Sequence, residues 1–192
     1  NIPKFLKTKW ATEDTAAFDK WRIPAAAPYR KDGVGAPADY LVKWLAAWVE
    51  EFGVDGFRCD TAKHVDLYRW KQLKEECKTS LNKWRASSKA TEPAKSWKDD
   101  FWMTGEAWGL GLELGNSYHT QGGFDSTINF SFNGSQGGTG RTPTTSDWTN
   151  YANQINNSQY NVLSYVSSHD TGLCRPSDMK QLGTMLILLP GG

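Results

Sequence analysis

The chain has 192 residues, 39% of them hydrophobic, so it can bury a substantial core, and its length favours a single domain. Its 22 basic residues nearly balance its 21 acidic ones, and the formal charge of +1 excludes the strongly basic surface that nucleic acid or an anionic membrane requires. No run approaches the roughly 20 apolar residues of a membrane span, and no targeting segment is visible after Asn1.

The first predicted element is an amphipathic helix over residues 37–52, with a proline at its start and Gly53 just past its end. Its apolar residues recur at helical spacing: Leu41, Trp44, Leu45, Trp48, Val49 and Phe52. A short β-like run over 54–60 follows, and residues 67–84 carry a long helical pattern. The polar stretch 86–100 predicts a connecting loop.

Three more strands are predicted further along the chain. They are residues 101–104, the alternating run 124–132 and residues 161–166. A loop rich in Gly, Thr and Ser over 133–146 leads to a short helix, for which Asp147 is the expected N-cap.

The last predicted helix runs from Met179 to Leu189. Strands that alternate with helices indicate an α/β chain with a parallel sheet, either open and doubly wound or closed into a barrel. Because a closed eight-stranded barrel needs about 250 residues, the pattern predicts part of a barrel, incomplete at both ends.

Three of the four predicted strands end on a carboxylate: Asp60, Glu106 and Asp170. The C-terminal ends of parallel strands lie at one face, where active sites form. Neighbouring strands are about 4.8 Å apart, and carboxylates about 5 to 5.5 Å apart suit a retaining glycosidase. Arg58 precedes Asp60 by two residues on the same strand face and favours its ionised, nucleophilic form. Asp60 is therefore the predicted nucleophile and Glu106 the predicted acid.

Taken singly, an Asp after a strand is often a helix N-cap, and a Glu there is often a surface residue. Three strand ends in register favour a catalytic site over that interpretation. His119, in a glycine-rich loop, is expected to be structural. The spacing of Cys59, Cys77 and Cys174 fits neither a disulfide framework nor a zinc site, so we expect three free, buried thiols.

Three segments resemble signature regions of the α-amylase family of glycoside hydrolases (family 13). Residues 56–64 (GFRCDTAKH) are similar to its second region, residues 105–108 (GEAW) to its third and residues 167–171 (SSHDT) to its fourth. Over most of its length the chain is most similar to the periplasmic, maltodextrin-cleaving bacterial members. The resemblance implies a secreted or periplasmic enzyme.

The resemblance implies roles for the three carboxylates. It makes Asp60 the nucleophile, Glu106 the general acid/base and Asp170 the transition-state stabiliser.

The resemblance also implies a set of substrate-binding residues. Arg58 orients the nucleophile, His169 hydrogen-bonds sugar hydroxyls, and Lys63 and His64 shape the leaving-group side of the cleft. Trp108 is the first candidate for stacking on a sugar ring, ahead of two tyrosines near the expected cleft, Tyr118 and Tyr165.

The resemblance further implies that the four strands are the fourth through seventh of a TIM (β/α)8 barrel. Residues 37–192 are then a partial catalytic barrel, and residues 1–36 are the end of the domain or loop inserted after the third strand. The family's first signature and eighth strand are missing from the chain, so the chain alone is expected to be inactive.

Calcium is the metal that the resemblance implies, with the backbone carbonyl of His64 as one ligand. Calcium prefers oxygen ligands, although Lys4 stands where many α-amylases have an Asp. No organic cofactor is expected.

The sequence is interpreted as an α-amylase-like hydrolase that cleaves α-1,4-glucosidic bonds in starch or maltooligosaccharides with retention. One alternative is a cyclomaltodextrinase, maltogenic hydrolase or α-glucosidase of the same family. Another, from a different class, is a non-catalytic sugar-binding or interaction relative. A nucleotide-binding fold is disfavoured because no glycine-rich phosphate loop follows any predicted strand.

Overall fold

The computed structural model describes residues 37–131, 145–170 and 176–188. The described part is an α/β chain whose four strands form one sheet. The chain divides into two compact units. The first comprises the described residues up to Phe57 together with Tyr68–Trp102, and the second comprises Arg58–Leu67 together with the residues from Met103 onward.

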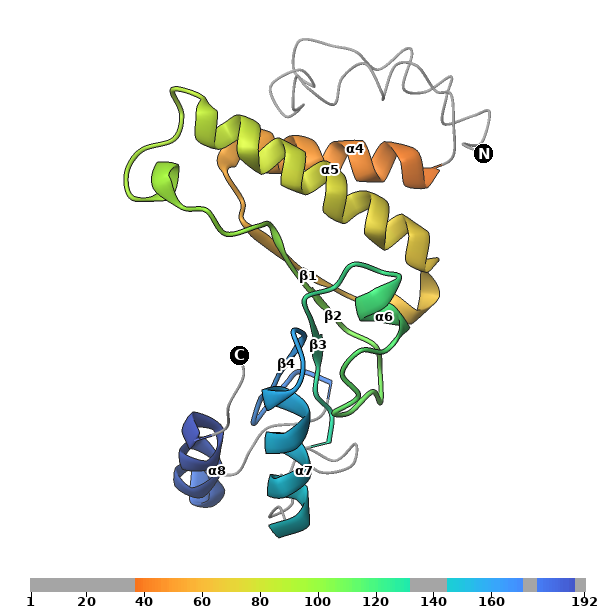
Figure 1. Cartoon of the computed structure of the whole chain (residues 1–192), viewed down its shortest axis with the longest axis vertical. Coiled ribbons are helices and arrows are strands. Elements are labelled where there is room, and N and C mark those ends of the chain that lie inside the picture. The colour runs from red at the N-terminus through yellow and green to blue at the C-terminus, as the bar shows by residue number, and fades with distance from the viewer. Residues whose placement is uncertain (1–36, 132–144, 171–175, 189–192) are drawn as a thin grey trace. The chain divides into compact units, whose positions relative to one another are not determined.

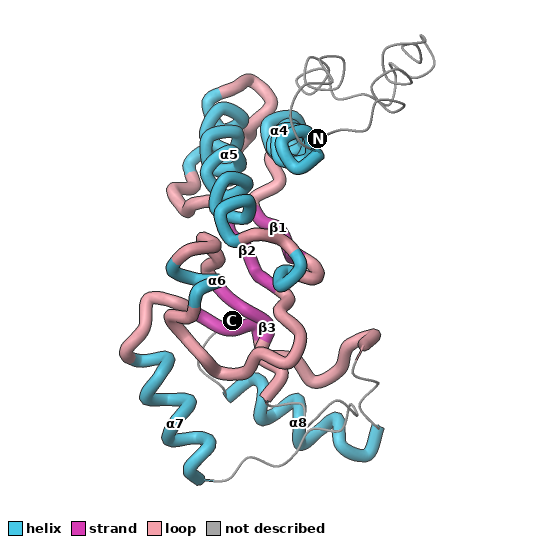
Figure 2. The backbone as a smooth tube through the Cα atoms, turned by 90° about the vertical axis from the view of Figure 1, so that its right-hand side faces the viewer, coloured by secondary structure: helices cyan, strands magenta, loops and turns pink. Residues whose placement is uncertain are grey.

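Two long helices, α4 (Pro37–Phe52) and α5 (Leu67–Ala86), lie side by side in the first unit (Figure 1, Figure 2). They confirm the two predicted helices, and α4 has the predicted bounds. Ion pairs between the helices fix how they align: Lys43 with Glu76, Arg69 with Asp39, and Lys83 with Glu50. A 3-10 turn, η3 (Ala94–Ser96), lies in the predicted loop that follows α5.

The buried face of α4 matches the one its apolar pattern predicts only in part, at Val49. Within the described residues, the buried side chains are the small ones, including Val42, Ala46 and Val49. Four large apolar residues of the predicted face are exposed instead: Leu41, Trp44, Trp48 and Phe52. The period of three and four residues identified the helix correctly, but small side chains permit a closer approach between helices than the Trp stripe does.

Strands β1 (Gly56–Cys59) and β2 (Trp102–Gly105) are neighbours in the sheet. The N–H of Trp102 donates to the carbonyl of Asp55 at 2.9 Å, and the N–H of Glu106 donates to the carbonyl of Cys59 at 2.8 Å. Both bonds join residues with the same sequence offset, as in a parallel pair.

Strands β3 (Ser126–Ile128) and β4 (Asn161–Leu163) complete the order β1-β2-β3-β4 (Figure 1). The pairs β2–β3 and β3–β4 are parallel. β3 is shorter than the predicted 124–132, because the N–H of Phe130 donates to the carbonyl of Leu110 (3.0 Å) rather than to a neighbouring strand. β4 likewise ends before residue 166.

Helices α7 (Thr145–Asn156) and α8 (Pro176–Leu188) belong to the second unit. Asp147 is not the N-cap predicted for α7, because the helix begins two residues earlier. Tyr151 of α7 and Val162 of β4 form a buried cluster, and partly buried residues pack against it: Leu112, Leu114, Trp148, Ile155, Met185 and Leu186. This cluster supports the β4 side of the sheet.

A four-residue helix that the sequence did not predict, α6 (Ser117–Thr120), follows β2. Asn116 caps it, since its side-chain oxygen accepts the N–H of Tyr118 at 2.8 Å. Two of the three predicted buried thiols, Cys59 and Cys77, are buried and form no disulfide within the described residues. Cys174 and residues 1–36 lie outside the described residues. No helix among the described residues has the length and apolar character to cross a membrane.

Candidate active site

The end of β1 presents a charged pair. Alternation along the strand puts Arg58 and Asp60 on the same side, while Cys59 between them is buried. The Nη1 atom of Arg58 donates to Oδ1 of Asp60. This bond, followed by one from Thr61, holds the pKa of Asp60 below its usual value. The predicted effect of Arg58 on Asp60 is confirmed, and Asp60 is ionised at neutral pH.

Thr61 links the first two carboxylates. Its hydroxyl donates to Oδ2 of Asp60 at 3.2 Å, and its backbone N–H donates to Oε2 of Glu106 at 2.8 Å. Its backbone lies in the left-handed region, with φ +48° and ψ +41°. That conformation costs a residue with a side chain about 1–2 kcal/mol. It is the only positive-φ residue other than glycine in the described part of the chain.

Glu106 follows directly after β2 and is buried, with 5% of its surface exposed. Its N–H donates to the carbonyl of Cys59 at 2.8 Å, and its own carbonyl accepts the N–H of Ala62 at 2.7 Å. The main chain of Glu106 is therefore held on both sides by the segment that carries Asp60. The expected proximity of Asp60 and Glu106 is confirmed by these bonds.

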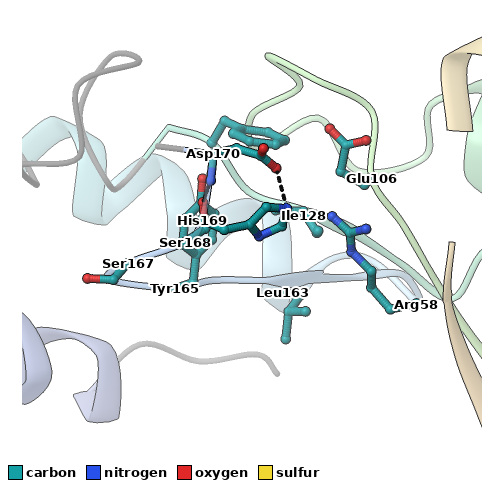
Figure 3. A pocket seen from close by; sticks show the side chains of 10 residues that line it. Arg58, Glu106, Ile128, Leu163, Tyr165, Ser167, Ser168, His169 and Asp170 are labelled. Carbon is teal, nitrogen blue, oxygen red and sulfur yellow. Dashed lines mark hydrogen bonds and ion pairs between the residues drawn. The ribbon is translucent and has the colours of Figure 1, made fainter. Parts of the chain in front are cut away.

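Asp170 and His169 follow β4. Nε2 of His169 lies 3.0 Å from Oδ2 of Asp170. Both residues line a pocket that Arg58 and Glu106 also line. Figure 3 shows the Arg58 guanidinium and the Glu106 carboxyl group facing the space that the His169 imidazole enters.

Asp60 is not among the residues that line this pocket. Its bond to Arg58 connects it to a residue of the pocket wall, and His169 is among the groups that lower the pKa of Asp60, after Arg58 and Thr61. Glu106 and Asp170 therefore line one pocket, and Asp60 adjoins it through Arg58. The joint catalytic role of the three acids stays a prediction.

The remaining pocket wall is largely apolar. It is formed by residues that end or follow β3 and β4: Ile128, Phe130, Leu163, Tyr165, Ser167 and Ser168. The rings of Phe130 and Tyr165 meet edge to face, with centroids 5.9 Å apart. A pocket that combines carboxyl groups with aromatic rings suits a sugar, which has polar edges and apolar faces.

Comparison with known proteins identifies the chain. Residues 29–177 match the model of the alpha-amylase catalytic domain. The chain belongs to the alpha-amylase family. It is 43% identical over 160 residues to the periplasmic alpha-amylase of Escherichia coli (strain K12). The aligned region covers 81% of this chain and 22% of that protein. It is 35% identical over 171 residues to the alpha-amylase of Streptomyces lividans, covering 85% of this chain and 17% of that protein.

The chain thus spans about a fifth of the length of the curated relatives it matches. Family membership applies to the matched catalytic domain. The activity and substrate of the whole protein are taken up as proposals.

Three of the predicted substrate-binding residues lie outside the pocket wall. Lys63 and His64 form a 3-10 turn, η2 (Ala62–His64), and both are exposed. The ring of Trp108 packs on Phe130, with centroids 5.1 Å apart, so it is one side chain removed from the pocket. Their roles stay predictions.

Several residues in and beside this pocket carried no separate signal in the sequence. Phe130 and Leu163 appeared only as strand residues, and Thr61 appeared only as a letter of the second signature. The hydrogen bonds of Thr61 depend on its backbone angles, which residue type does not reveal. His119, in contrast, is buried as expected of a structural residue, with its ring stacked on Tyr160.

Proposed function

We propose that this chain carries the catalytic residues of a retaining hydrolase of α-1,4-glucans. The observation that supports the proposal most strongly is the bridge through Thr61, which joins a paired, ionised Asp60 to a buried Glu106 at adjacent strand ends. Retaining glycosidases need two carboxyl groups that flank one glycosidic bond.

In the proposed reaction, an oxygen of Asp60 attacks the anomeric carbon while Glu106 transfers its proton to the departing glycosidic oxygen. A covalent glycosyl–Asp60 ester and a shortened glucan result. Glu106, now ionised, takes a proton from water, and that water releases the sugar with retained configuration. Asp170 and His169, across the pocket, are the proposed partners of the sugar hydroxyls and of the charge that develops on the ring.

The proposed substrate is starch or a maltooligosaccharide, because both relatives are named alpha-amylases. A cyclomaltodextrinase, maltogenic hydrolase or α-glucosidase of the same family is the alternative. Product analysis on amylose and on cyclodextrin separates these activities. Export to the periplasm or the medium is proposed because one relative is a periplasmic enzyme.

We also propose that the four parallel strands are the fourth through seventh of a (β/α)8 barrel, with residues 1–36 ending an insertion that follows the third strand. The order β1-β2-β3-β4 and the match to the alpha-amylase catalytic domain support this assignment. Calcium at the His64 carbonyl is a further proposal. Among the described residues, no three His, Cys, Asp or Glu side chains gather to hold a metal, so such a site needs oxygen ligands from elsewhere.

The decisive experiment compares the full-length wild-type protein with Glu106→Gln on a chromogenic maltooligosaccharide. Loss of a general acid/base lowers the rate by about 10²–10⁴-fold. Glu113→Gln, an exposed residue in the loop after β2, is the matched control and is expected to keep wild-type activity. Equal hydrolysis by wild type and Glu106→Gln would refute the catalytic assignment and favour the non-catalytic sugar-binding alternative.

A further inference from the structure

Thr61 lies at a position where a threonine side chain usually makes a capping hydrogen bond, and here the side chain makes a different bond. It is the N-cap residue of η2, and a Thr at that position usually accepts a backbone N–H of the following turn. No such capping bond exists here. The hydroxyl donates to Oδ2 of Asp60 instead, at 3.2 Å.

The two oxygens of Asp60 therefore have different donors. Arg58 contacts Oδ1 and Thr61 contacts Oδ2. A carboxylate held at both oxygens has a fixed plane, so the lone pair that attacks a sugar carbon is aimed before the substrate binds.

The backbone of Thr61 holds the other carboxyl group. Its N–H donates to Oε2 of Glu106 at 2.8 Å, and its φ is +48°. A β-branched residue rarely adopts this conformation, and strained backbone of this kind gathers at functional sites. The strain thus coincides with contact to both acids.

We infer that Thr61 is a positioning residue that sets the nucleophile Asp60 and the acid/base Glu106 relative to each other. The inference rests on the proposed hydrolase function. The hydroxyl orients the Asp60 carboxylate and favours its ionised form, while the backbone N–H anchors Glu106.

The test uses four variants of the full-length protein. Thr61→Val removes the hydroxyl and keeps the shape, Thr61→Ser keeps the hydroxyl, and Thr61→Gly removes the hydroxyl but tolerates positive φ and keeps the N–H. Thr79→Val is the matched control, because its hydroxyl is also exposed and donates only to the Glu75 carbonyl on α5, at 3.0 Å.

We expect Thr61→Val and Thr61→Gly to lose about tenfold in kcat/KM, the size expected for a lost hydrogen bond to a charged group. The acidic limb of the kcat/KM profile moves to higher pH in both, since the Thr61 bond lowers the pKa of Asp60. Thr61→Ser restores the limb, and Thr79→Val leaves both quantities unchanged. A purely structural role for Thr61 would not move the limb.

Wild-type rates and an unmoved acidic limb in Thr61→Val and Thr61→Gly would overturn the inference, as would an equal loss in Thr61→Ser. If Thr61→Val unfolds, Thr61→Gly alone decides. The Glu106→Gln variant shows whether a negative result refutes only the role of Thr61 or also the proposed hydrolase function. An inactive Glu106→Gln beside a fully active Thr61→Val refutes only the role of Thr61, whereas an inactive wild type or an active Glu106→Gln refutes both.

Discussion

Arg58 and Asp60 are paired along one side of β1, with the guanidinium Nη1 against the carboxylate Oδ1. Arg58 is the largest contributor to the low pKa of Asp60, ahead of Thr61. A carboxyl group with a lowered pKa in the folded protein contributes stability that is present above its unfolded pKa and lost as the pH falls through the folded pKa. Because Asp60 is exposed, the acidic limb of activity is a better readout than stability.

We predict that Arg58→Met moves the acidic limb of kcat/KM to higher pH, because loss of the cation raises the pKa of Asp60. Arg58→Lys is expected to recover only part of this effect, because an ammonium group lacks the planar fork of guanidinium. Arg85→Met is the control, since its Nη1 donates to the backbone carbonyl of Asp99. An acidic limb that stays in place in Arg58→Met would contradict the assignment of Asp60.

Asp170→Asn tests the third carboxylate. It removes the charge but keeps the shape of the side chain that faces His169 in the pocket. We expect kcat to fall by about 10²–10³-fold, as for loss of one electrostatic group aimed at a transition state. Asp66→Asn, an exposed carboxylate between η2 and α5, serves as the control and should keep its rate. Unchanged kcat in Asp170→Asn would remove this residue from the site.

Two glycines are predicted to respond to alanine in opposite directions. Gly53 ends α4 with φ +69°, and a Cβ there would lie 2.3 Å from Cε2 of Trp84. Gly53→Ala should therefore lower the free energy of unfolding by about 2–3 kcal/mol. Gly183 lies within α8 with nothing within 4 Å of an added Cβ, and Gly183→Ala should raise it by about 0.5–1 kcal/mol. Denaturant titration followed by Trp fluorescence measures both, and the same sign in the two variants would contradict the prediction.

His119 is predicted to make stability depend on pH. It is 3% exposed, and its Nδ1 accepts the N–H of Gly115 at 3.1 Å. Burial lowers its pKa below 6.5, against the opposing effects of the Asn161 backbone and the charge of Asp125. The unfolded chain then binds a proton that the folded protein does not, so stability falls as the pH drops below about 6.5 and levels off below the folded pKa.

The non-titrating variant His119→Asn should show a flatter dependence of unfolding free energy on pH over that window. The measurement is a series of denaturant titrations between pH 5 and pH 8, about the range in which histidine titrates. A slope as steep in His119→Asn as in the wild type would assign the dependence to other groups.

Calcium is tested by chelation of the full-length protein. A metal that binds only the folded state stabilises it by mass action, so EDTA should lower the Tm and added calcium should restore it. Magnesium, which demands a smaller and more regular site, should restore it less well. A Tm insensitive to both EDTA and calcium would contradict the proposed calcium site.

The sequence predicted the long helices and the succession of strands along the chain because periodicity and boundary residues are local signals. Helix α4 begins and ends where Pro37 and Gly53 indicated, and the long α5 followed its apolar spacing. Strand lengths were less predictable. β3 ends before Phe130 because the N–H of that residue bonds to Leu110, a partner that no local pattern reveals.

The positions of the three candidate acids after strands were predictable because each belongs to a recognisable segment. What the sequence could not supply was how they are joined. Thr61 looks like an ordinary turn residue until its φ and its two bonds are known. The buried face of α4 was also hidden, since the choice between its Trp stripe and its small residues depends on the neighbouring helix.

Peptide groups, rather than side chains, attach the main chain of Glu106 to the neighbouring segment, through Cys59 and Ala62. Every residue can make these main-chain bonds, except proline at the donor position. The side chains at positions 59 and 62 can therefore change without removing the bonds, provided that the new side chain fits the buried space. Random mutagenesis of this family member can therefore vary those two positions among small apolar residues to change stability, while the main-chain bonds that hold Glu106 stay in place.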